Sequence, residues 1–262
     1  MKFCRFVPLD SSPPQPASPL YGLLEGQRIH EISGSPWDPW SQGSRTWEVP
    51  AVRLLAPIEP TKIVCVGRNY AAHAAELGNE LPKEPLIFLK PPSAIIAPGE
   101  PIVLPPQSQR VEHEGELALV VGRPCSQLKE SDDALAYLLG YSCLNDVTAR
   151  DLQKSDVQFT RAKGFDTFCP VGPYIETHLD SSDVQVETRV NGALRQSGRT
   201  SLMVYPVAFL VRWISHVMTL YPGDLIATGT PAGVGPLVAG DVVEVSVDGV
   251  GVLRNPVQAL HT

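Results

Sequence analysis

Residues 111–122 read Val-Glu-His-Glu-Gly-Glu-Leu-Ala-Leu-Val-Val-Gly, and the rest of the chain is organised around them. Successive side chains of a strand point to opposite faces, so we expect Glu112, Glu114 and Glu116 on one face and His113 on the other. Like charges on a strand that runs into an apolar segment are unfavourable unless solvent or a cation screens them. A hard divalent metal would resolve this conflict.

Asp146 supplies another carboxylate at the far end of the same region. Residues 141–153 read as a strand that runs into a helical turn, and Asp146 lies at the junction, where it either points into a site or caps the helix. Together with Glu114 and Glu116 it would form a ligand set made only of oxygen atoms. Such a set suits Mg²⁺ or Mn²⁺, suits Ca²⁺ less well, and does not suit structural Zn²⁺, which favours Cys or His.

The bulk composition favours small-molecule chemistry in a β-rich protein. The 262 residues carry a formal net charge of -7 and contain no cluster of Lys or Arg, which argues against nucleic acid as a partner. The 26 prolines and 21 glycines indicate many turns and few long helices. Periodicity predicts one clear amphipathic helix at residues 206–220, and Asn191-Gly192 predicts a hairpin turn.

The cysteines and the hydropathy pattern predict a soluble cytoplasmic protein. The five cysteines are odd in number and form no C-x-x-C pair, which is typical of reduced thiols. The N-terminus lacks the apolar run of a signal peptide, and charge interrupts the apolar stretches before they reach membrane-spanning length. We therefore expect no association with a membrane.

Two domains are expected. Residues 1–60 alternate short β patterns, at 1–9 and 21–32, with Pro- and Ser-rich loops such as Ser11–Pro16. They predict a small N-terminal β domain without reactive groups. Residues 61–262 predict a catalytic domain, which begins with the buried strand pattern at residues 62–67.

A short helix pattern at residues 69–78 carries a candidate base. Asn69 can serve as its N-cap and Gly78 can end it. His73 and Glu76 are three residues apart and share a face, where the carboxylate can orient the imidazole and stabilise its protonated form. On spacing alone, a solvated surface pair is the better-supported alternative. A helix this short suits a lid that closes over a ligand.

Two lysines and a Gly-Thr loop supply further candidate contacts. Lys90 ends a strand pattern at residues 85–92, and Lys163 lies between small residues, where a following glycine permits close approach of a ligand. Exposed lysines are the alternative for both. The segment 225–236 lacks nucleotide-binding spacings, but its Thr228-Gly229-Thr230 could offer backbone and hydroxyl donors to a small carboxylate.

Taken in order, these motifs make the chain resemble the fumarylacetoacetate hydrolase family over about residues 60–262. A departure is the pair Glu112-His113, where the family often has an acidic residue and an aromatic one. The resemblance rests on Val66-Gly67-Arg68-Asn69-Tyr70 with His73 and Glu76, Phe88-Leu89-Lys90-Pro91, Glu114-Gly115-Glu116-Leu117, residues 145–151, Arg161-Ala162-Lys163, Val190-Asn191-Gly192 and residues 228–235.

The resemblance implies a fold, an assembly and a set of site residues. The fold would be α+β and β-dominated, a mixed β-sandwich roll with a small N-terminal β appendage, and the protein would be a homodimer. A divalent metal, with Mg²⁺ preferred, would be held by Glu114, Glu116 and Asp146. The catalytic residues would be His73, Glu76 and Lys163. The substrate-binding residues would be Arg68, Lys90, Gln153, Thr228, Gly229 and Thr230.

The activity implied by the resemblance is chemistry on a small oxo-acid. The substrate's C1 carboxylate and C2 oxygen would chelate the metal, which stabilises the enolate left when the C3–C4 bond breaks. We expect hydrolysis of a 2,4-dioxo acid of the acylpyruvate or fumarylpyruvate type, with His73 and Glu76 activating a water. The alternatives are oxaloacetate decarboxylation or tautomerisation, isomerisation of 2-hydroxyhepta-2,4-diene-1,7-dioate, and decarboxylation of 5-carboxymethyl-2-oxo-hex-3-ene-1,7-dioate.

A function of a different class also remains open. The chain could be a metal-stabilised β module that acts only by binding, with His73, Glu76 and Lys163 as surface residues. The substitutions Glu116→Gln and His73→Ala would separate the two classes, because only an enzyme needs the histidine.

Overall fold

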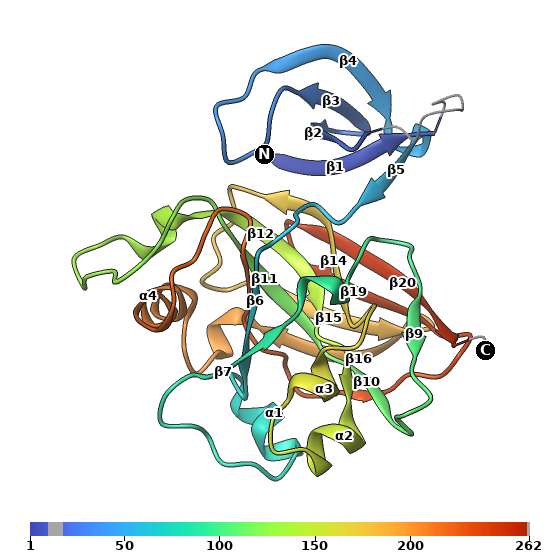
Figure 1. Cartoon of the computed structure of the whole chain (residues 1–262), viewed down its shortest axis with the longest axis vertical. Coiled ribbons are helices and arrows are strands. Elements are labelled where there is room, and N and C mark those ends of the chain that lie inside the picture. The colour runs from blue at the N-terminus through green and yellow to red at the C-terminus, as the bar shows by residue number, and fades with distance from the viewer. Residues whose placement is uncertain (10–17, 261–262) are drawn as a thin grey trace.

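The computed structural model describes residues 1–9 and 18–260, so the predicted loop at Ser11–Pro16 lies outside the described residues. Strands dominate, and the helices between them are short. Figure 1 shows the first strands as a small lobe above a larger body. The prediction of a β-dominated α+β fold is confirmed.

Most strands belong to one 12-stranded sheet, with β5 paired to β1 and β8 paired to β14 outside its main path. The main path runs β4-β3-β2-β1-β14-β12-β11-β17-β6-β7. The pairs β17·β6 and β8·β14 are parallel, and the other pairs are antiparallel. The strands are β1 (Lys2–Pro8), β2 (Leu20–Glu25), β3 (Arg28–Ile32), β4 (Gln42–Glu48), β5 (Val52–Leu55), β6 (Ile63–Gly67), β7 (Leu86–Lys90), β8 (Ile95–Ile96), β11 (Gly115–Val121), β12 (Leu138–Asn145), β14 (Cys169–Glu176) and β17 (Leu225–Ala227).

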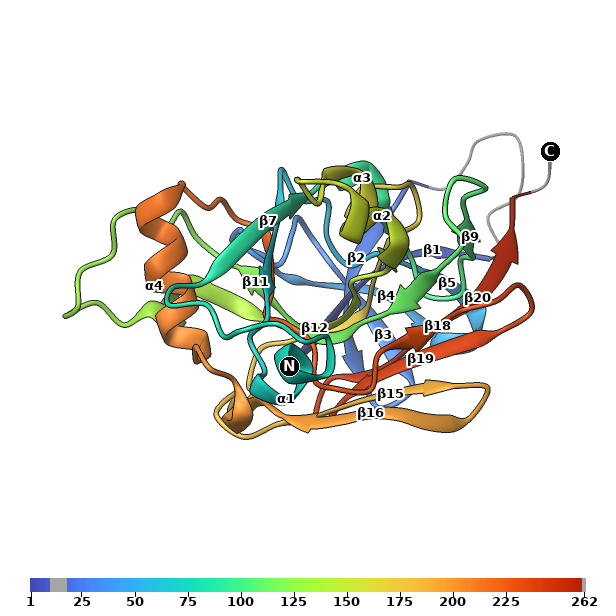
Figure 2. The same cartoon turned by 90° about the horizontal axis from the view of Figure 1, so that it is seen from below.

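Two smaller sheets complete the body. A five-stranded sheet has the order β16-β15-β19-β20-β9, and a three-stranded sheet has the order β13-β10-β18. Figure 2 shows β15, β16 and β19 as a layer below β11 and β12. The strands are β9 (Ile102–Leu104), β10 (Val111–His113), β13 (Thr148–Ala149), β15 (Gln185–Val190), β16 (Ala193–Arg199), β18 (Gly235–Pro236), β19 (Val242–Val247) and β20 (Gly251–Ala259).

Strand β11 is buried on both faces and forms the centre of the body. Leu117 and Val121 pack into one core together with Val245 of the five-stranded sheet. Ala118 and Val120, which point the other way, belong to a separate core. This alternation is the strand pattern predicted from the sequence, and the two packed layers form the predicted mixed β-sandwich.

The helices lie at the edges of the sheets. The predicted amphipathic helix is confirmed as α4, whose Leu210 and Ile214 enter the β11 core. No described helix is long and apolar enough to cross a membrane. The helices are α1 (Ala71–Glu76), α2 (Arg150–Ser155), α3 (Thr160–Lys163) and α4 (Val207–Val217), with 3₁₀ helices at Val49–Ala51, Pro92–Ala94, Ala134–Tyr137 and Thr200–Leu202.

Asn69 does not cap α1, contrary to the prediction. The helix begins at Ala71 with Tyr70 in the cap position, and no side chain donates or accepts a cap hydrogen bond there. The Asn69 amide instead donates to the carbonyls of Tyr205 and Thr228, and its oxygen accepts the Tyr205 N–H. Because Asn69 is fully buried, its amide requires such partners, and it ties the start of α1 to two distant loops.

The N-terminal lobe continues the main sheet. Strand β1 pairs with β14, with Lys2 opposite Glu176 and Phe3 opposite Ile175. Phe3 also joins the core that contains Ile63 of β6. The predicted boundary near residue 60 falls between β5 and β6.

Candidate active site

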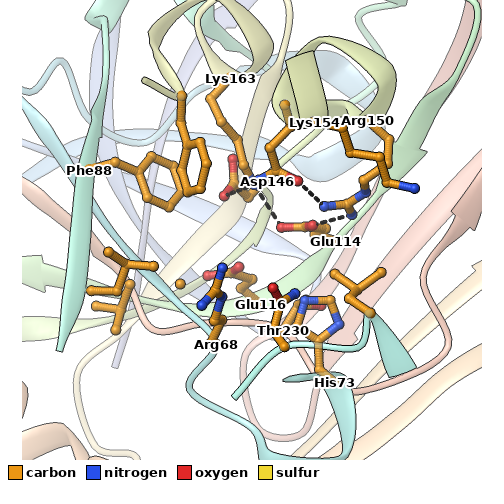
Figure 3. A pocket seen from close by; sticks show the side chains of 17 residues that line it. Arg68, His73, Phe88, Glu114, Glu116, Asp146, Arg150, Lys154, Lys163 and Thr230 are labelled. Carbon is orange, nitrogen blue, oxygen red and sulfur yellow. Dashed lines mark hydrogen bonds and ion pairs between the residues drawn. The ribbon is translucent and has the colours of Figure 1, made fainter. Parts of the chain in front are cut away.

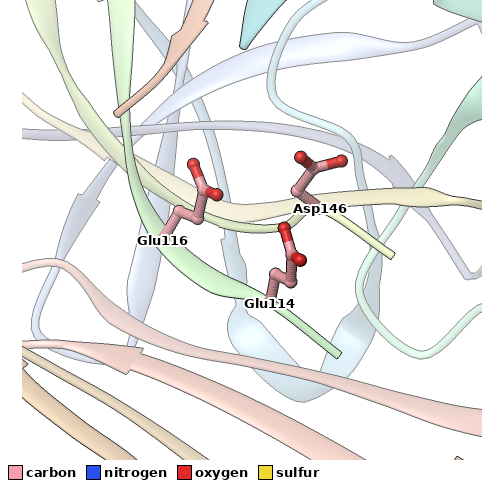
Figure 4. Close-up of side chains that lie close together, drawn as sticks. All are labelled: Glu114, Glu116 and Asp146. Carbon is pink, nitrogen blue, oxygen red and sulfur yellow. The ribbon is translucent and has the colours of Figure 1, made fainter. Parts of the chain in front are cut away.

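Three carboxylates meet where β11 begins and β12 ends. Glu114 directly precedes β11, Glu116 is its second residue, and Asp146 follows β12. The two strands are antiparallel with Gly115 opposite Asn145, so their ends bring the side chains together (Figure 4). One oxygen from each carboxylate lies within 4.8 Å of the others, and all three residues are buried. The structure thus brings together the residues predicted as metal ligands.

Glu112 belongs to a neighbouring ion-pair network and not to this cluster. The strand pattern is interrupted at Glu114, between β10 and β11. Glu112 accepts hydrogen bonds from Arg110 at 2.5 Å and from Arg150 at 2.7 Å. Arg150 also pairs with Glu114, so it links the two glutamates. Glu112 therefore acts on the cluster through Arg150.

Buried cations neutralise two of the three carboxylates. Lys163 Nζ lies 2.7 Å from Glu114 Oε2 and 2.6 Å from Asp146 Oδ2, and Lys90 Nζ lies 2.5 Å from Asp146 Oδ1. Burial would raise the pKa of Glu114, but Lys163 and Arg150 outweigh it and hold that pKa well below its usual range. Burial likewise opposes the charge of Lys163, yet the two carboxylates raise its pKa. Figure 3 shows the pairs that Lys163 makes with Glu114 and Asp146 and the pair between Arg150 and Glu114.

Glu116 has no cation partner among residues 1–9 and 18–260. Its Oε2 accepts the N–H of Gly229 at 2.7 Å. Burial first, and then the charges of Asp146 and Glu114, raise the pKa of Glu116 well above its usual value. Gly229 has a φ of 99°, and a Cβ there would lie 2.7 Å from the Asn69 Cβ, so this position requires glycine.

The donor set fits a hard divalent cation. Carboxylate oxygens are the ligands that Mg²⁺ and Mn²⁺ prefer. Glu116 is the carboxylate that the described cations leave unpaired, and a bound cation would offset the cost of ionising it in a buried site. Glu114, Glu116 and Asp146 could therefore hold a metal.

His73 lies on the wall of the same pocket. The residue is 5% exposed, and burial lowers the pKa of its imidazole despite the nearby Glu114 carboxylate. Its Nδ1 is buried without a hydrogen-bond partner in the described chain and lies 3.6 Å from Glu76 Oε2. Glu76 does not line the pocket, and both its oxygens accept the Gly233 N–H at 3.1 Å. The predicted pair is thus present, slightly beyond hydrogen-bonding distance.

The residues predicted to bind substrate divide into two groups. Lys90 holds Asp146, the Thr228 hydroxyl donates to the Leu117 carbonyl at 2.8 Å, and the Gly229 N–H is used by Glu116. These three residues hold the carboxylates from behind. They lie there because β17 pairs with both β11 and β6, and β6 pairs with β7, which ends at Lys90. The loop sequence does not indicate this pairing. Arg68, Gln153 and Thr230 line the pocket, whereas Lys90, Thr228 and Gly229 do not.

Gln196 of β16 fixes Thr230, and nothing in the sequence pattern marked it. Its Nε2 donates to Thr230 Oγ1 at 2.6 Å and to the Pro231 carbonyl at 2.7 Å, and its Oε1 accepts the Gly115 N–H at 3.0 Å. A carbonyl can only accept and an N–H can only donate, so the orientation of the amide is determined. His113 Nδ1, 3.0 Å from the same Oε1, must therefore donate.

This network changes the predicted role of Thr230. Its hydroxyl donates to the Gly115 carbonyl at 2.8 Å while accepting from Gln196. The hydrogen of the hydroxyl is therefore used inside the protein, and only a lone pair remains for a bound molecule. Thr230 can accept a hydrogen bond from a ligand but, in this arrangement, cannot donate one to a carboxylate.

The pocket has a volume of about 230 Å³. Two basic residues on its wall, Arg150 and Lys154, are one helical turn apart on α2. Lys154 was not predicted, although its spacing of four from Arg150 was a usable signal. The remaining lining residues are Val66, Gly67, Arg68, His73, Leu77, Asn79, Leu86, Phe88, Glu114, Glu116, Asp146, Gln153, Phe159, Lys163 and Thr230.

Comparison with known proteins gives two adjoining matches. Residues 62–258 match the family model described as Fumarylacetoacetate (FAA) hydrolase C-terminal, and residues 1–57 match the model described as Rv2993c-like, N-terminal. Protein Rv2993c of Mycobacterium tuberculosis is 53% identical over 230 residues, which cover 87% of this chain and 86% of that protein.

Two further relatives carry functional names. Oxaloacetate tautomerase FAHD2B, mitochondrial, of Bos taurus is 44% identical over 219 residues, which cover 79% of this chain and 69% of that protein. The crystal structure of 2-hydroxyhepta-2,4-diene-1,7-dioate isomerase from Mycobacterium marinum is 46% identical and superposes with a TM-score of 0.90, covering 100% of both chains.

Proposed function

Because this chain belongs to the fumarylacetoacetate hydrolase family, we propose that its acidic pocket is the active site of a Mg²⁺-dependent enzyme that moves a proton on a small 2-oxo acid. The observation that carries the proposal is the meeting of three buried carboxylates with a buried histidine in one pocket. The relatives named a tautomerase and an isomerase support this reaction class.

The carboxylates Glu114, Glu116 and Asp146 would hold the Mg²⁺, which supplies positive charge to stabilise the negative charge that develops on the substrate's oxygen atoms. Lys163 bridges Glu114 and Asp146 and fixes the direction of both carboxylates. Arg150 holds Glu114 from the opposite side. Mg²⁺ is proposed over Ca²⁺ because a few carboxylates with open water positions suit it.

His73 would take the proton from the carbon next to the carbonyl and return it at another atom. Burial lowers its pKa, so the imidazole is neutral and can accept a proton near neutral pH. Glu76, 3.6 Å from Nδ1, would hold the ring and stabilise the imidazolium after a small approach. Such contacts are often long without substrate and shorten when it binds.

The second candidate is hydrolysis of a C–C bond in an acylpyruvate or fumarylpyruvate. The neighbouring carboxylate and imidazole of Glu76 and His73 favour it, because such a pair can deprotonate a water. Decarboxylation of oxaloacetate or of 5-carboxymethyl-2-oxo-hex-3-ene-1,7-dioate would use the same carboxylates without the water.

A substrate panel tests the proposal. Oxaloacetate, 2-hydroxyhepta-2,4-diene-1,7-dioate, acetylpyruvate and fumarylpyruvate are incubated with the Mg²⁺-loaded protein and monitored for enol absorbance, pyruvate and CO₂. We expect loss of enol absorbance from oxaloacetate or the dienedioate to exceed release of pyruvate or CO₂. The proposal is wrong if the folded protein turns over none of them with Mg²⁺ or Mn²⁺.

A pair of variants separates an enzyme from a metal-stabilised binding module. His73→Ala should fold normally and lose about 10²- to 10⁴-fold in turnover, the usual effect of removing a general base. Glu116→Gln should also fold and lose turnover. In a binding module His73→Ala has no consequence, and Glu116→Gln lowers the stability of the metal-loaded protein only.

Two expectations from the sequence stay predictions. Sedimentation of the purified protein would test whether it is a homodimer, and fractionation of cells would test a cytoplasmic location.

A further inference from the structure

The cations of the pocket fall into two groups. Arg150 and Lys163 of the pocket lining, and Lys90 behind it, each pair with a buried carboxylate. Arg68 and Lys154 line the pocket as well, but neither side chain has an ion pair or hydrogen bond within residues 1–9 and 18–260. Positive charges without partners in a pocket indicate a place for a negative group of a ligand.

Lys154 lies one helical turn beyond Arg150 on α2, so both side chains are on one face of that helix. Arg150 is 3% exposed and pairs inward, whereas Lys154 is exposed. Figure 3 shows Lys154 beside Arg150, on the side of the pocket opposite Arg68, with Glu114 between them. We call the carboxylates Glu114, Glu116 and Asp146 with their bound cations the floor of the pocket, and the exposed part of its wall around Gln153 and Lys154 the rim. Helix α2 thus supplies a paired cation, Arg150, to the floor and one that is unpaired in the described chain, Lys154, to the rim.

The side-chain amide of Gln153, next to Lys154 in the chain, can also donate a hydrogen bond to a ligand. Gln153 Oε1 accepts a hydrogen bond from Arg150 at 2.5 Å, so the part of the amide still free to bind a ligand is its NH₂. The carboxylates that line the described pocket are Glu114, Glu116 and Asp146, which all belong to the floor. The rim around α2 therefore offers donors and positive charge, which is the complement of a carboxylate.

We propose that Lys154 binds the distal carboxylate of a dicarboxylic 2-oxo acid and so selects such acids over monocarboxylic ones. The inference rests on the proposed function, because it takes the 2-oxo acid end of the substrate to lie at the floor. A pocket of about 230 Å³ suits an acid of a few carbon atoms, whose far end then reaches the rim. Lys154 is a specificity residue and takes no part in the proton transfer.

The expected effect is moderate because Lys154 is exposed and water screens its charge. A single charged contact of this kind changes affinity by roughly five- to tenfold. The effect should fall on ligands with a second carboxylate and should weaken with added salt. A general effect of Lys154 on folding or on the metal would instead change both kinds of ligand equally.

The test measures binding by calorimetry to the Mg²⁺-loaded protein. 2-Oxoglutarate and 2-oxopentanoate have five carbon atoms each and differ in the terminal carboxylate. Both are titrated into the wild type, Lys154→Met, Lys154→Arg and the control Lys129→Met. Lys129 is an exposed lysine outside the pocket lining.

The inference expects the wild type to prefer 2-oxoglutarate, and Lys154→Met to reduce that preference roughly five- to tenfold with 2-oxopentanoate unaffected. Lys154→Arg should retain the preference, and Lys129→Met should match the wild type. A wild type without the preference, including one that binds neither acid, or an unchanged preference in Lys154→Met, would overturn the inference. Failure of the substrate panel would refute the proposed function instead, since this binding measurement needs no turnover.

Discussion

The positive charges on the floor of the pocket are paired with carboxylates, whereas the positive charge on its rim is unpaired within the described residues. On the floor, Lys90, Lys163 and Arg150 are buried and each is bound to a carboxylate. On the rim Lys154, and on the opposite wall Arg68, carry charges that no side chain of the described chain pairs. Groups that must stay in one place are held by the protein itself, and groups that meet a ligand are left open.

The same contrast exists within the floor. Glu114 and Asp146 each contact a lysine, whereas Glu116 has a backbone N–H as its hydrogen-bond partner in the described structure. The pKa of Glu114 is held low and that of Glu116 is raised, although both are buried. A positive charge is therefore missing beside Glu116, where a divalent cation would supply it.

Removing the cation between the paired carboxylates should have the largest effect. Lys163→Met leaves Glu114 and Asp146 facing each other in a buried site, and we expect a loss of about 3–5 kcal/mol in the free energy of unfolding. Urea unfolding measures it. The matched rim variant Lys154→Met should change stability by less than about 0.5 kcal/mol. Similar losses in the two variants would erase the distinction between floor and rim.

Glu116→Gln should raise the free energy of unfolding in the absence of Mg²⁺ and lower it, relative to the wild type, in the presence of Mg²⁺. Without metal, the neutral amide can still accept from Gly229 and avoids the cost that burial and Asp146 place on ionising Glu116, so we expect the free energy of unfolding to rise by about 1 kcal/mol. With Mg²⁺ at 100 times its Kd, the wild type should gain about 2.7 kcal/mol that the variant lacks. Thermal unfolding with and without Mg²⁺ measures both. A loss in both conditions would show that Glu116 needs no cation.

His113→Phe should have a smaller effect, because it removes one hydrogen bond from the frame behind the floor. Gln196 Oε1 keeps the Gly115 N–H when the His113 donor is lost, so we expect about 1 kcal/mol lower stability. Mg²⁺ affinity should change little. A loss of Mg²⁺ binding in this variant would mean that the hydrogen bonds of His113 and Gln196 are needed to hold the metal-binding carboxylates in place.

The smallest expected effect is the pH response of His73. Burial lowers its folded pKa, so the unfolded chain binds a proton more readily and the stability contributed by the neutral ring is complete above a pH of about 6.5. That contribution declines as the pH falls below this value. NMR titration of the imidazole should give a midpoint below about 6.5, and a midpoint above it would show that Glu76 or Glu114 dominates.

The sequence was sufficient to name the three carboxylates of the floor, but it was insufficient to predict which residues hold those carboxylates in place. Strand alternation places Glu112, Glu114 and Glu116 on one face without distinguishing them, and the family resemblance singles out Glu114 and Glu116 as metal ligands. The residues alone leave Asp146 as either a site residue or a helix cap, the resemblance makes it a ligand, and the pairing of β11 with β12 brings it beside the glutamates. The roles of Lys90 and Gly229 depend on how β17 pairs with β6 and β11, which no local pattern encodes.

For two further residues, Asn69 and Thr230, tertiary contacts override the role that the local sequence predicts. Asn69 is a good helix cap by residue type, but its buried amide is used to tie loops together. Thr230 was expected to donate to a substrate, but Gln196 and the Gly115 carbonyl fix its hydroxyl as an acceptor. Both depend on partners far along the chain.

The number of Mn²⁺ ions bound per chain, measured by electron paramagnetic resonance in competition with Mg²⁺, tests whether Glu114, Glu116 and Asp146 hold a metal. We expect one site in the wild type, with its affinity for Mn²⁺ lowered at least about 100-fold in Glu116→Gln. The control Glu130→Gln, which removes an exposed carboxylate, should bind as the wild type does. Equal Mn²⁺ binding by the wild type and Glu116→Gln would contradict the claim that these three carboxylates hold the metal.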